Sequence, residues 1–227
     1  MSTSENRVIQ LDNVSVMYDY HKVLDNVSFS LDVGEFCYLI GKTGAGKSSF
    51  LKLLYRDLKP DDGSITVAGY PVSDLRDKDV PYLRRRLGIV FQDFQLLPDR
   101  NIFENVAFAL EVTGQRKRFI KKRVLEVLGM VGLSHKRKAM PTDLSGGEQQ
   151  RIVIARALAG EPRIMLADEP TGNLDPEASR SIMDLLKQIN NRGMTVLMVT
   201  HDYNTVKDFP NRTVEVANGK LREVKLI

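Results

Sequence analysis

A glycine-rich segment with one lysine and one serine at its end is the strongest chemical signal in this chain. It reads Gly41-Lys42-Thr43-Gly44-Ala45-Gly46-Lys47-Ser48. Glycines let consecutive backbone N–H groups turn toward one anion, and a helix that starts there adds its positive dipole end. The lysine can reach the terminal phosphates of a nucleotide, and the serine hydroxyl can bind Mg²⁺. The segment therefore predicts a phosphate-binding loop.

The residues on either side of this loop have the pattern that it requires. Residues 35–40 are mostly apolar and indicate a buried strand that runs into the loop. Residues 48–55 have the spacing of a helix that leaves it. A tight turn without a ligand is the alternative, and the strand–loop–helix order argues against it.

Two adjacent carboxylates, Asp168 and Glu169, follow a second apolar strand at 164–167. Four apolar residues in a row predict a central strand that is buried on both faces. Ligands of open parallel sheets bind at the carboxyl edge, so Asp168 is placed to hold Mg²⁺ and Glu169 to polarise an attacking water. Alone, the pair could be a solvated strand end. Together with the glycine loop, it indicates nucleotide hydrolysis.

Four further motifs occur in a fixed order along the chain. Gln92 follows an apolar strand at 87–91, and Leu144-Ser145-Gly146-Gly147-Glu148-Gln149 comes next. Gly172-Asn173-Leu174-Asp175 follows the acidic pair, and His201 follows the strand at 195–200. In this order they resemble the glutamine loop, signature, aspartate loop and switch histidine of ATP-binding-cassette ATPases. The resemblance covers essentially the whole chain.

The resemblance implies an α/β fold: a P-loop NTPase (RecA-like) core with an antiparallel β subdomain and an inserted α-helical signature subdomain. The pattern along the sequence agrees with this architecture. Strands are expected at 8–11, 27–31, 64–67, 164–167 and 196–199, and helices at 103–112, at 124–130 and from Asp175-Pro176 onward. We therefore expect one nucleotide-binding domain, 1–227, with core segments 1–91 and 160–227 and a helical lobe at 92–159.

The resemblance also implies roles at the matching positions. Glu169 is the expected base, His201 would bond the γ-phosphate and orient the water, and Gln92 would approach both the water and the metal. Mg²⁺ is expected at Ser48, Gln92 and Asp168. The residues expected to bind ATP are Tyr18, Gly41, Lys42, Thr43, Gly44, Ala45, Gly46, Lys47, Ser48, Ser49, Asp168, Ser145, Gly146, Gly147, Glu148 and Asp175.

Three of these assignments have a plain structural alternative. Tyr18 matches the family aromatic that stacks on adenine, but it could be a half-buried strand tyrosine, and Tyr20 competes for the role. Asp175 would line the dimer seam, and it could also cap the helix before Pro176. His201 could be a structural histidine at a strand end.

The signature is expected to act on a second copy of the chain. Ser145-Gly146-Gly147 opens a helix, so it again offers N–H groups to phosphate. In the family this helix end faces the γ-phosphate bound to the other subunit, which implies a head-to-tail homodimer.

The sequence also bears on location. No apolar run approaches the roughly 18 residues of a membrane span, and residues 1–7 lack the apolar core of a signal peptide. We therefore expect a soluble protein that faces the cytoplasm. The family resemblance implies that it is bound peripherally at the cytoplasmic face of the inner membrane, through an integral membrane partner whose cytoplasmic helix docks around residues 92–110.

The segment 91–110 resembles the cell-division branch of the family more than the branches that power lipoprotein release or macrolide efflux. Under that reading, ATP turnover controls cell-wall hydrolysis through the membrane partner. A transporter motor and an ATP-dependent scaffold are the alternatives. Intact Glu169 and His201 argue against the scaffold, because a protein that only binds ATP needs no residue that activates water.

The net charge, the basic runs and the cysteine content limit which other functions the chain can have. The net charge is +4, with basic runs at 84–86, 116–118, 121–123 and 136–138. These runs are a solvated helical face, or a contact with an anionic membrane or with acidic segments of a partner. No nucleic-acid-binding motif accompanies them. The single cysteine, Cys37, excludes a disulfide framework, and we expect it to be buried and inert.

Overall fold

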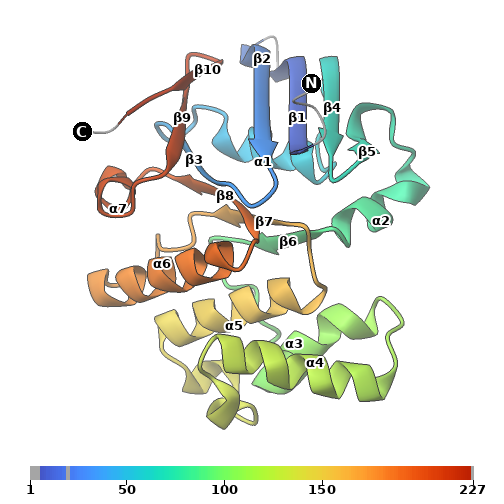
Figure 1. Cartoon of the computed structure of the whole chain (residues 1–227), viewed down its shortest axis with the longest axis vertical. Helices are drawn as coiled ribbons and strands as arrows, with labels where there is room; N and C mark the ends of the chain where they lie inside the picture. Colours follow the sequence, from blue (N-terminus) through green and yellow to red (C-terminus); the bar gives the residue numbers. More distant parts are fainter. Residues whose placement is uncertain (1–5, 19–20, 226–227) are drawn as a thin grey trace.

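The computed structural model describes residues 6–18 and 21–225. Within these residues the strands form two sheets, and a group of helices packs below them in the view of Figure 1. The expected α/β architecture is therefore confirmed.

The larger sheet has the strand order β10-β9-β3-β8-β7-β6. Its strands are parallel except for β10, which pairs with β9 in the antiparallel sense. The members are β3 (Phe36–Ile40), β6 (Leu87–Val90), β7 (Ile164–Asp168), β8 (Thr195–Thr200), β9 (Arg212–Ala217) and β10 (Lys220–Glu223). Since β3, β7 and β8 lie inside this order, their side chains are buried on both faces.

The smaller sheet is antiparallel throughout and has the order β2-β1-β4-β5. Its strands are β1 (Arg7–Tyr18), β2 (His21–Asp32), β4 (Asp62–Val67) and β5 (Tyr70–Pro71). The expected strands at 8–11 and 27–31 are parts of the two long strands β1 and β2.

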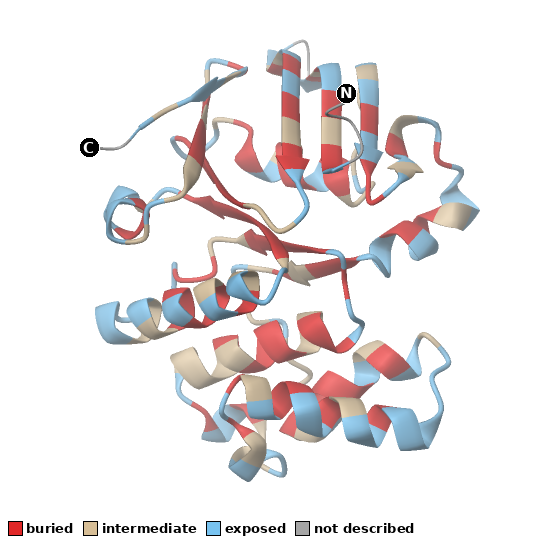
Figure 2. Cartoon of the chain, in the orientation of Figure 1, coloured by how far each residue is buried: buried red, intermediate tan, exposed pale blue. Residues whose placement is uncertain are grey.

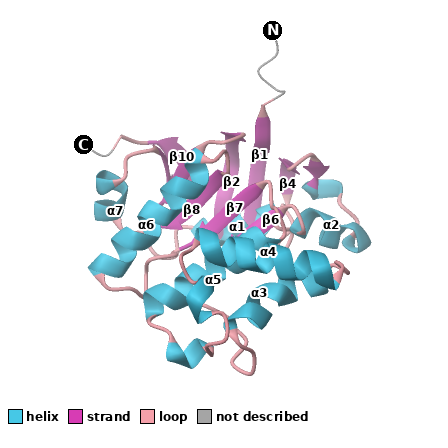
Figure 3. Cartoon of the chain, turned by 60° about the horizontal axis from the view of Figure 1, so that its bottom comes forward, coloured by secondary structure: helices cyan, strands magenta, loops and turns pink. Residues whose placement is uncertain are grey.

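Helices fill the connections between strands. They are α1 (Lys47–Leu54), α2 (Val80–Arg84), α3 (Ile102–Glu111), α4 (Lys117–Met130), α5 (Gly146–Ala159), α6 (Pro176–Asn191) and α7 (Tyr203–Asp208), with short 3₁₀ turns η1 (Val72–Asp74), η2 (Asp77–Asp79), η3 (Ser134–Lys136) and η4 (Pro141–Asp143). Helices α3 and α4 pack on α5, which contacts both α6 and the edge strand β6 (Figure 3).

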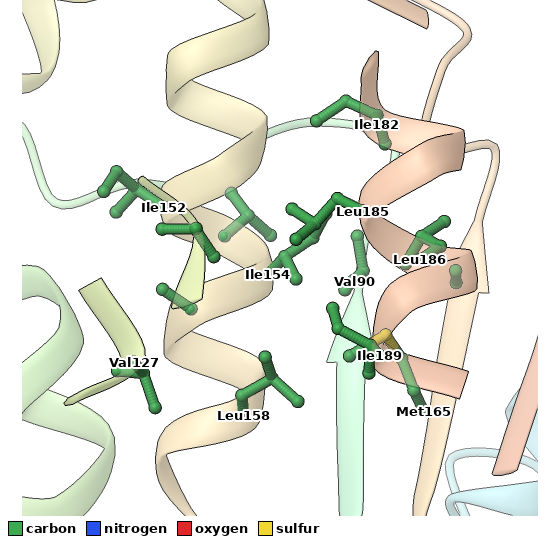
Figure 4. Close-up of a cluster of buried hydrophobic side chains, with 14 of the residues drawn as sticks. Val90, Val127, Ile152, Ile154, Leu158, Met165, Ile182, Leu185, Leu186 and Ile189 are labelled. Carbon is green, nitrogen blue, oxygen red and sulfur yellow. The ribbon is translucent and has the colours of Figure 1, made fainter. Parts of the chain in front are cut away.

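Alternate residues of the larger sheet enter two different cores. Tyr38 of β3 and Met165 of β7 face the helices, and Figure 4 shows Met165 beside side chains of α6 such as Ile189. Cys37 and Leu166 face the opposite way, into a core that α1 and the antiparallel sheet complete. The expected burial of Cys37 is therefore confirmed, and it raises the pKa of the thiol to about 12.

Side chains cap the helices that matter for the site. Asn101 and Glu104 form a capping box at the start of α3, and Ser145 and Glu148 form another at the start of α5. Asp175 caps α6, whose first residue is Pro176. The helix start expected at Asp175-Pro176 is therefore confirmed.

The structure also differs from the expected elements. Helix α4 starts at Lys117, seven residues before the expected 124, because Ile120 extends its buried stripe by one turn. Helices α2 and α7 and the strands β9 and β10 were not expected. Strand β9 alternates buried and partly buried residues along the edge of β3, a pattern too short to stand out in the sequence.

In the ranges that the structure describes, no helix combines the length and apolar character needed to cross a membrane.

Gly88 of β6 lies close to the backbone at the end of α5. A Cβ added there would lie 2.9 Å from the carbonyl oxygen of Ala157 and 3.0 Å from Cγ of Pro162. We expect Gly88→Ala to lower the free energy of unfolding by about 1–3 kcal/mol, because it forces packed backbone apart. The matched control is Gly160→Ala, where nothing lies within 4 Å of the added Cβ. Urea denaturation should show little change for the control, and equal losses in both variants would contradict the packing argument.

Candidate functional site

Three neighbouring parallel strands end together at one edge of the larger sheet. Ile40, the last residue of β3, pairs with Thr200, the last residue of β8. Asp168, the last residue of β7, pairs with Val199 of β8. The glycine loop, the acidic pair and His201 therefore leave the sheet side by side, at the edge where the sequence places them.

The glycine loop runs from β3 into α1 in a conformation that needs its glycines. Gly46, the residue before α1, has φ 106°, and a Cβ added there would lie 3.0 Å from Val23. A Cβ at Gly41 would lie 2.6 Å from the carbonyl oxygen of Val216 in β9. The first turn of α1 carries no acidic residue, so its positive dipole end is not neutralised locally.

Lys47 folds back over this loop. Its side chain is buried, with 8% of the residue exposed, and Nζ donates to the carbonyl oxygens of Gly41 at 2.7 Å and Lys42 at 3.1 Å. An ammonium group has three N–H donors, so one remains for an anion in the loop. Ser48 follows on α1 and is exposed, while Ser49 is half-buried.

The carboxylate of Asp168 lies in a partly buried position beside the negative charge of Glu169, and both features destabilise its ionised form. Burial raises the pKa of its carboxyl group, and the adjacent Glu169 raises the pKa further, while Lys47 and Lys52 lower it. A divalent cation would relieve this repulsion, and hydroxyl, carboxylate and amide oxygens are the ligands that Mg²⁺ accepts. The donor set of Ser48, Asp168 and Gln92 therefore fits Mg²⁺.

The described residues contain no cluster of three or more His, Cys, Asp or Glu side chains able to hold a metal. A Mg²⁺ at this edge would therefore depend on phosphate oxygens for several of its ligands, as is common for this ion.

Glu169 and His201 form a close pair. Nδ1 of His201 lies 2.6 Å from Oε1 of Glu169, and the hydroxyl of Thr200 donates to Oε2 at 3.3 Å. Glu169 has φ 47°, in the left-handed region, and its N–H bonds the carbonyl oxygen of Val199 at 2.9 Å. This turn aims a carboxylate with 11% side-chain exposure at a groove of 510 Å³ that His201 also lines. The pair can orient a water and accept its proton.

Gln92 lies beside the turn that follows Glu169. Its Nε2 is 3.5 Å from the position of a Cβ added to Gly172, and its carbonyl oxygen accepts a bond from Nδ2 of Asn173 at 3.3 Å. The structure therefore brings the glutamine loop, the acidic pair and the aspartate loop together.

Two side chains that the sequence analysis missed hold the loop after Gln92. Arg156 of α5 donates to the carbonyl oxygens of Phe94 at 3.2 Å and Gln95 at 2.6 Å. Asn105 of α3 is fully buried and bonds both the N–H and the carbonyl oxygen of Leu97. The available signal was a lone polar residue inside an apolar helical run, since Arg156 lies within Ile-Val-Ile-Ala-Arg-Ala-Leu-Ala.

The signature, residues 144–149, lies at the start of α5, next to the aspartate loop. A Cβ added to Gly146 would lie 3.2 Å from Leu174 of the aspartate loop. Glu148 caps α5 with Ser145 and pairs with Lys136 at 2.5 Å, and Lys136 lowers the pKa of its carboxyl group. The N–H groups of residues 146 and 147 then point outward from the helix end. Within the described chain, no hydrogen bond joins the signature to the glycine loop.

The structure also gives the positions of other residues that were expected to bind ATP. Oδ1 of Asp175 accepts from the N–H of Ala178 at 2.8 Å, so its helix-cap role is present. Tyr18 is 43% exposed at the end of β1, opposite His21. Tyr20, its competitor for adenine stacking, lies outside the described residues. Thr43 and Gly44 are exposed in the loop, and Ala45 is half-buried.

Comparison with known proteins extends this picture. The profile of the family described as ABC transporter matches residues 24–172. The cell division ATP-binding protein FtsE of Streptococcus pneumoniae is 49% identical over 215 residues, covering 94% of each chain. The methionine import ATP-binding protein MetN of Haemophilus influenzae is 40% identical over 221 residues, covering 95% of this chain and 64% of MetN.

A solved structure is similar across the whole fold. It is the dimeric ATP-binding cassette MJ0796 in a post-hydrolysis state bound to ADP and Pi, with 37% identity and a TM-score of 0.83, covering 96% of this chain and 99% of the other.

The raised pKa of Asp168 predicts a pH-dependent stability. Above the ordinary aspartate value of 3.8, the folded chain holds this proton more tightly than the unfolded chain. The free energy of unfolding therefore falls as the pH rises through the raised pKa. Asp168→Asn removes this loss, so the nucleotide-free variant should melt at a higher temperature than the wild type near pH 7, by a margin that shrinks toward pH 4.

Thermal melts at several pH values, with Asp99→Asn at an exposed position as the control, check this expectation. A lower melting temperature for Asp168→Asn at neutral pH would contradict it.

Proposed function

The chain belongs to the ABC transporter family and hydrolyses ATP, and from this premise we propose that it is the ATPase subunit of an FtsE-type complex. An FtsX-like integral membrane partner would receive its motion and control cell-wall hydrolases during division. The chain would be bound peripherally, through this partner, at the cytoplasmic face of the inner membrane.

The similarity to FtsE carries this proposal. It amounts to nearly half of all positions and extends over 94% of both chains. The paired Glu169 and His201 support turnover rather than ATP binding alone, because a carboxylate held beside an imidazole is an arrangement that can activate water.

The proposed reaction is in-line attack of water on the γ-phosphate. Glu169 takes the proton of the water, and His201, held through Nδ1, keeps both in position. Lys47 and the loop N–H groups bind the phosphate oxygens, which spreads the charge of the transition state over fixed donors. When bound at Ser48, Asp168 and Gln92, Mg²⁺ would neutralise part of the phosphate charge.

A head-to-tail homodimer would complete each site. The outward N–H groups of Gly146 and Gly147 offer an anion site that does not bond the glycine loop of its own chain. A second copy, related by a two-fold axis, can supply the phosphate that this site lacks. The similar cassette MJ0796 is described as dimeric, which supports the arrangement.

A groove of 730 Å³ lined by residues of α2, α3, α4 and α5 is the proposed docking site for a cytoplasmic helix of the partner, and it overlaps the segment 92–110 expected from the sequence only at Ala109 and Leu110. Exposed apolar side chains line it, among them Tyr82, Val112 and Phe119. Arg156 lies in the same groove and bonds the loop after Gln92. An apolar helix in the groove would therefore press on the residue that holds the glutamine loop, and so connect partner movement to the ATP site.

Transport is the second candidate. The similarity to MetN, named for methionine import, favours it. In that case the chain would drive a permease. An importer would match the name of MetN, and an exporter of the lipoprotein-release or macrolide type is the alternative expected from the sequence.

Affinity capture from native membranes tests the proposal. We expect the wild-type chain to recover a four-span FtsX-like protein. Val112→Asp places a charge in the groove, where it is 61% exposed, and should abolish recovery while basal ATPase activity stays near the wild-type rate. Val33→Asp, at a position 57% exposed outside the groove, is the matched control and should leave recovery intact.

The outcomes separate the candidates. Recovery of a larger permease would favour transport, and loss of capture in both aspartate variants would contradict the groove assignment.

A further inference from the structure

Positive charge without a partner gathers on α4. Five cations lie on this helix and just before it: Arg116, Lys117, Arg118, Lys121 and Lys122. All five are exposed. In the part of the chain that the structure describes, none of the ion pairs includes any of them.

The carboxylates near α4 are engaged by other cations. Arg123 lies 2.9 Å from Glu126 and 3.7 Å from Glu161, and it also bonds carbonyl oxygens at the end of α5. Glu111 pairs with Arg100 at 3.7 Å. The acids of this region therefore neutralise arginines that have structural roles, and the five cations leave a positive surface.

The helix period places cations and an apolar side chain on the same outward stripe. Arg118, Lys122 and Leu125 follow one another at spacings of four and three, opposite the buried stripe of α4. Leu125 is 38% exposed, and Figure 2 shows exposed positions along this helix. Such a stripe is typical of helices that lie on a charged, partly apolar surface.

A hollow of 400 Å³ lies between α3 and α4, beside this stripe. Phe103 and Ile120 form its apolar part, and Lys117 and Lys121 form its cationic part. Glu111 also lines it, paired with Arg100 as above. An apolar floor under two ammonium groups matches an amphiphile with an anionic head. A nucleic acid backbone, or a peptide made only of acidic residues, has no apolar group to cover that floor.

We propose that this face of α4, with the adjoining hollow, binds the anionic headgroups of phospholipids at a membrane surface. The cations attract the lipid phosphates, and Leu125 and the apolar floor contact the upper part of the acyl chains. Binding belongs to the isolated chain and does not require the membrane partner. Its failure would therefore leave the proposed function untouched.

Vesicle sedimentation of the purified chain tests this inference. We expect binding to vesicles that contain phosphatidylglycerol, no binding to pure phosphatidylcholine, and weakening by added salt. The triple variant Arg118→Gln, Lys121→Gln, Lys122→Gln should bind about a hundredfold more weakly, because each cation at an anionic surface contributes about fivefold. Glutamine keeps the helix propensity, so circular dichroism and ATPase activity without vesicles should be unchanged.

The matched control is Lys59→Gln, Lys78→Gln, Lys207→Gln, which removes the same charge from exposed positions on other elements. It should retain binding to the anionic vesicles. The proposal is overturned if the wild type fails to sediment with them at low salt, or if both triple variants lose binding equally. Binding to an acidic peptide without binding to vesicles would also overturn it, and would assign the face to a protein partner.

Discussion

The parallel pairing of β3, β8 and β7 is the constraint on which the site depends. These strands are buried on both faces, so their backbone groups must pair with each other, and the pairing sets Ile40 level with Thr200 and Asp168 level with Val199. A shift of one residue would exchange the two cores that Tyr38 and Cys37 enter. The hydrophobic pattern therefore fixes where the loop, the acids and the histidine meet.

The charged side chains at that edge of the sheet explain why the site favours bound ligands. Asp168 and Glu169 repel one another in a partly buried place, and Lys47 and Lys52 only partly offset this repulsion. Lys47 uses the loop carbonyls as acceptors, and Glu169 holds a left-handed backbone conformation next to His201. Such an arrangement favours an anion and a cation bound together, as Mg²⁺ and ATP would be.

The sequence predicted the residues of the candidate site better than the residues that hold its loops in position. Glycine spacing and the apolar strand before two acids pointed to the loop and Glu169 because those signals are local, whereas His201 was predicted only from its place in the order of family motifs. Arg156 and Asn105 form hydrogen bonds with the loop after Gln92 from helices that the fold brings near, and no pattern in the nearby sequence predicts these bonds. Glu148 caps α5 and pairs with Lys136, a structural role that the sequence analysis did not predict. Strand β9 is positioned in the sheet by its pairing with β3, and the composition of the segment alone does not predict this pairing.

We propose that ATP is held between two copies of the chain, and light scattering of Glu169→Gln with Mg-ATP tests this shared site. The change keeps the shape of the side chain and removes its basicity, so hydrolysis stops and the closed state accumulates. We expect a particle of about 51 kDa, twice the 25.6 kDa chain. Adding Ser145→Arg should return the protein to a monomer that still binds ATP. A dimer that survives this second change, or a monomer in the single variant with ATP bound, would contradict the shared site.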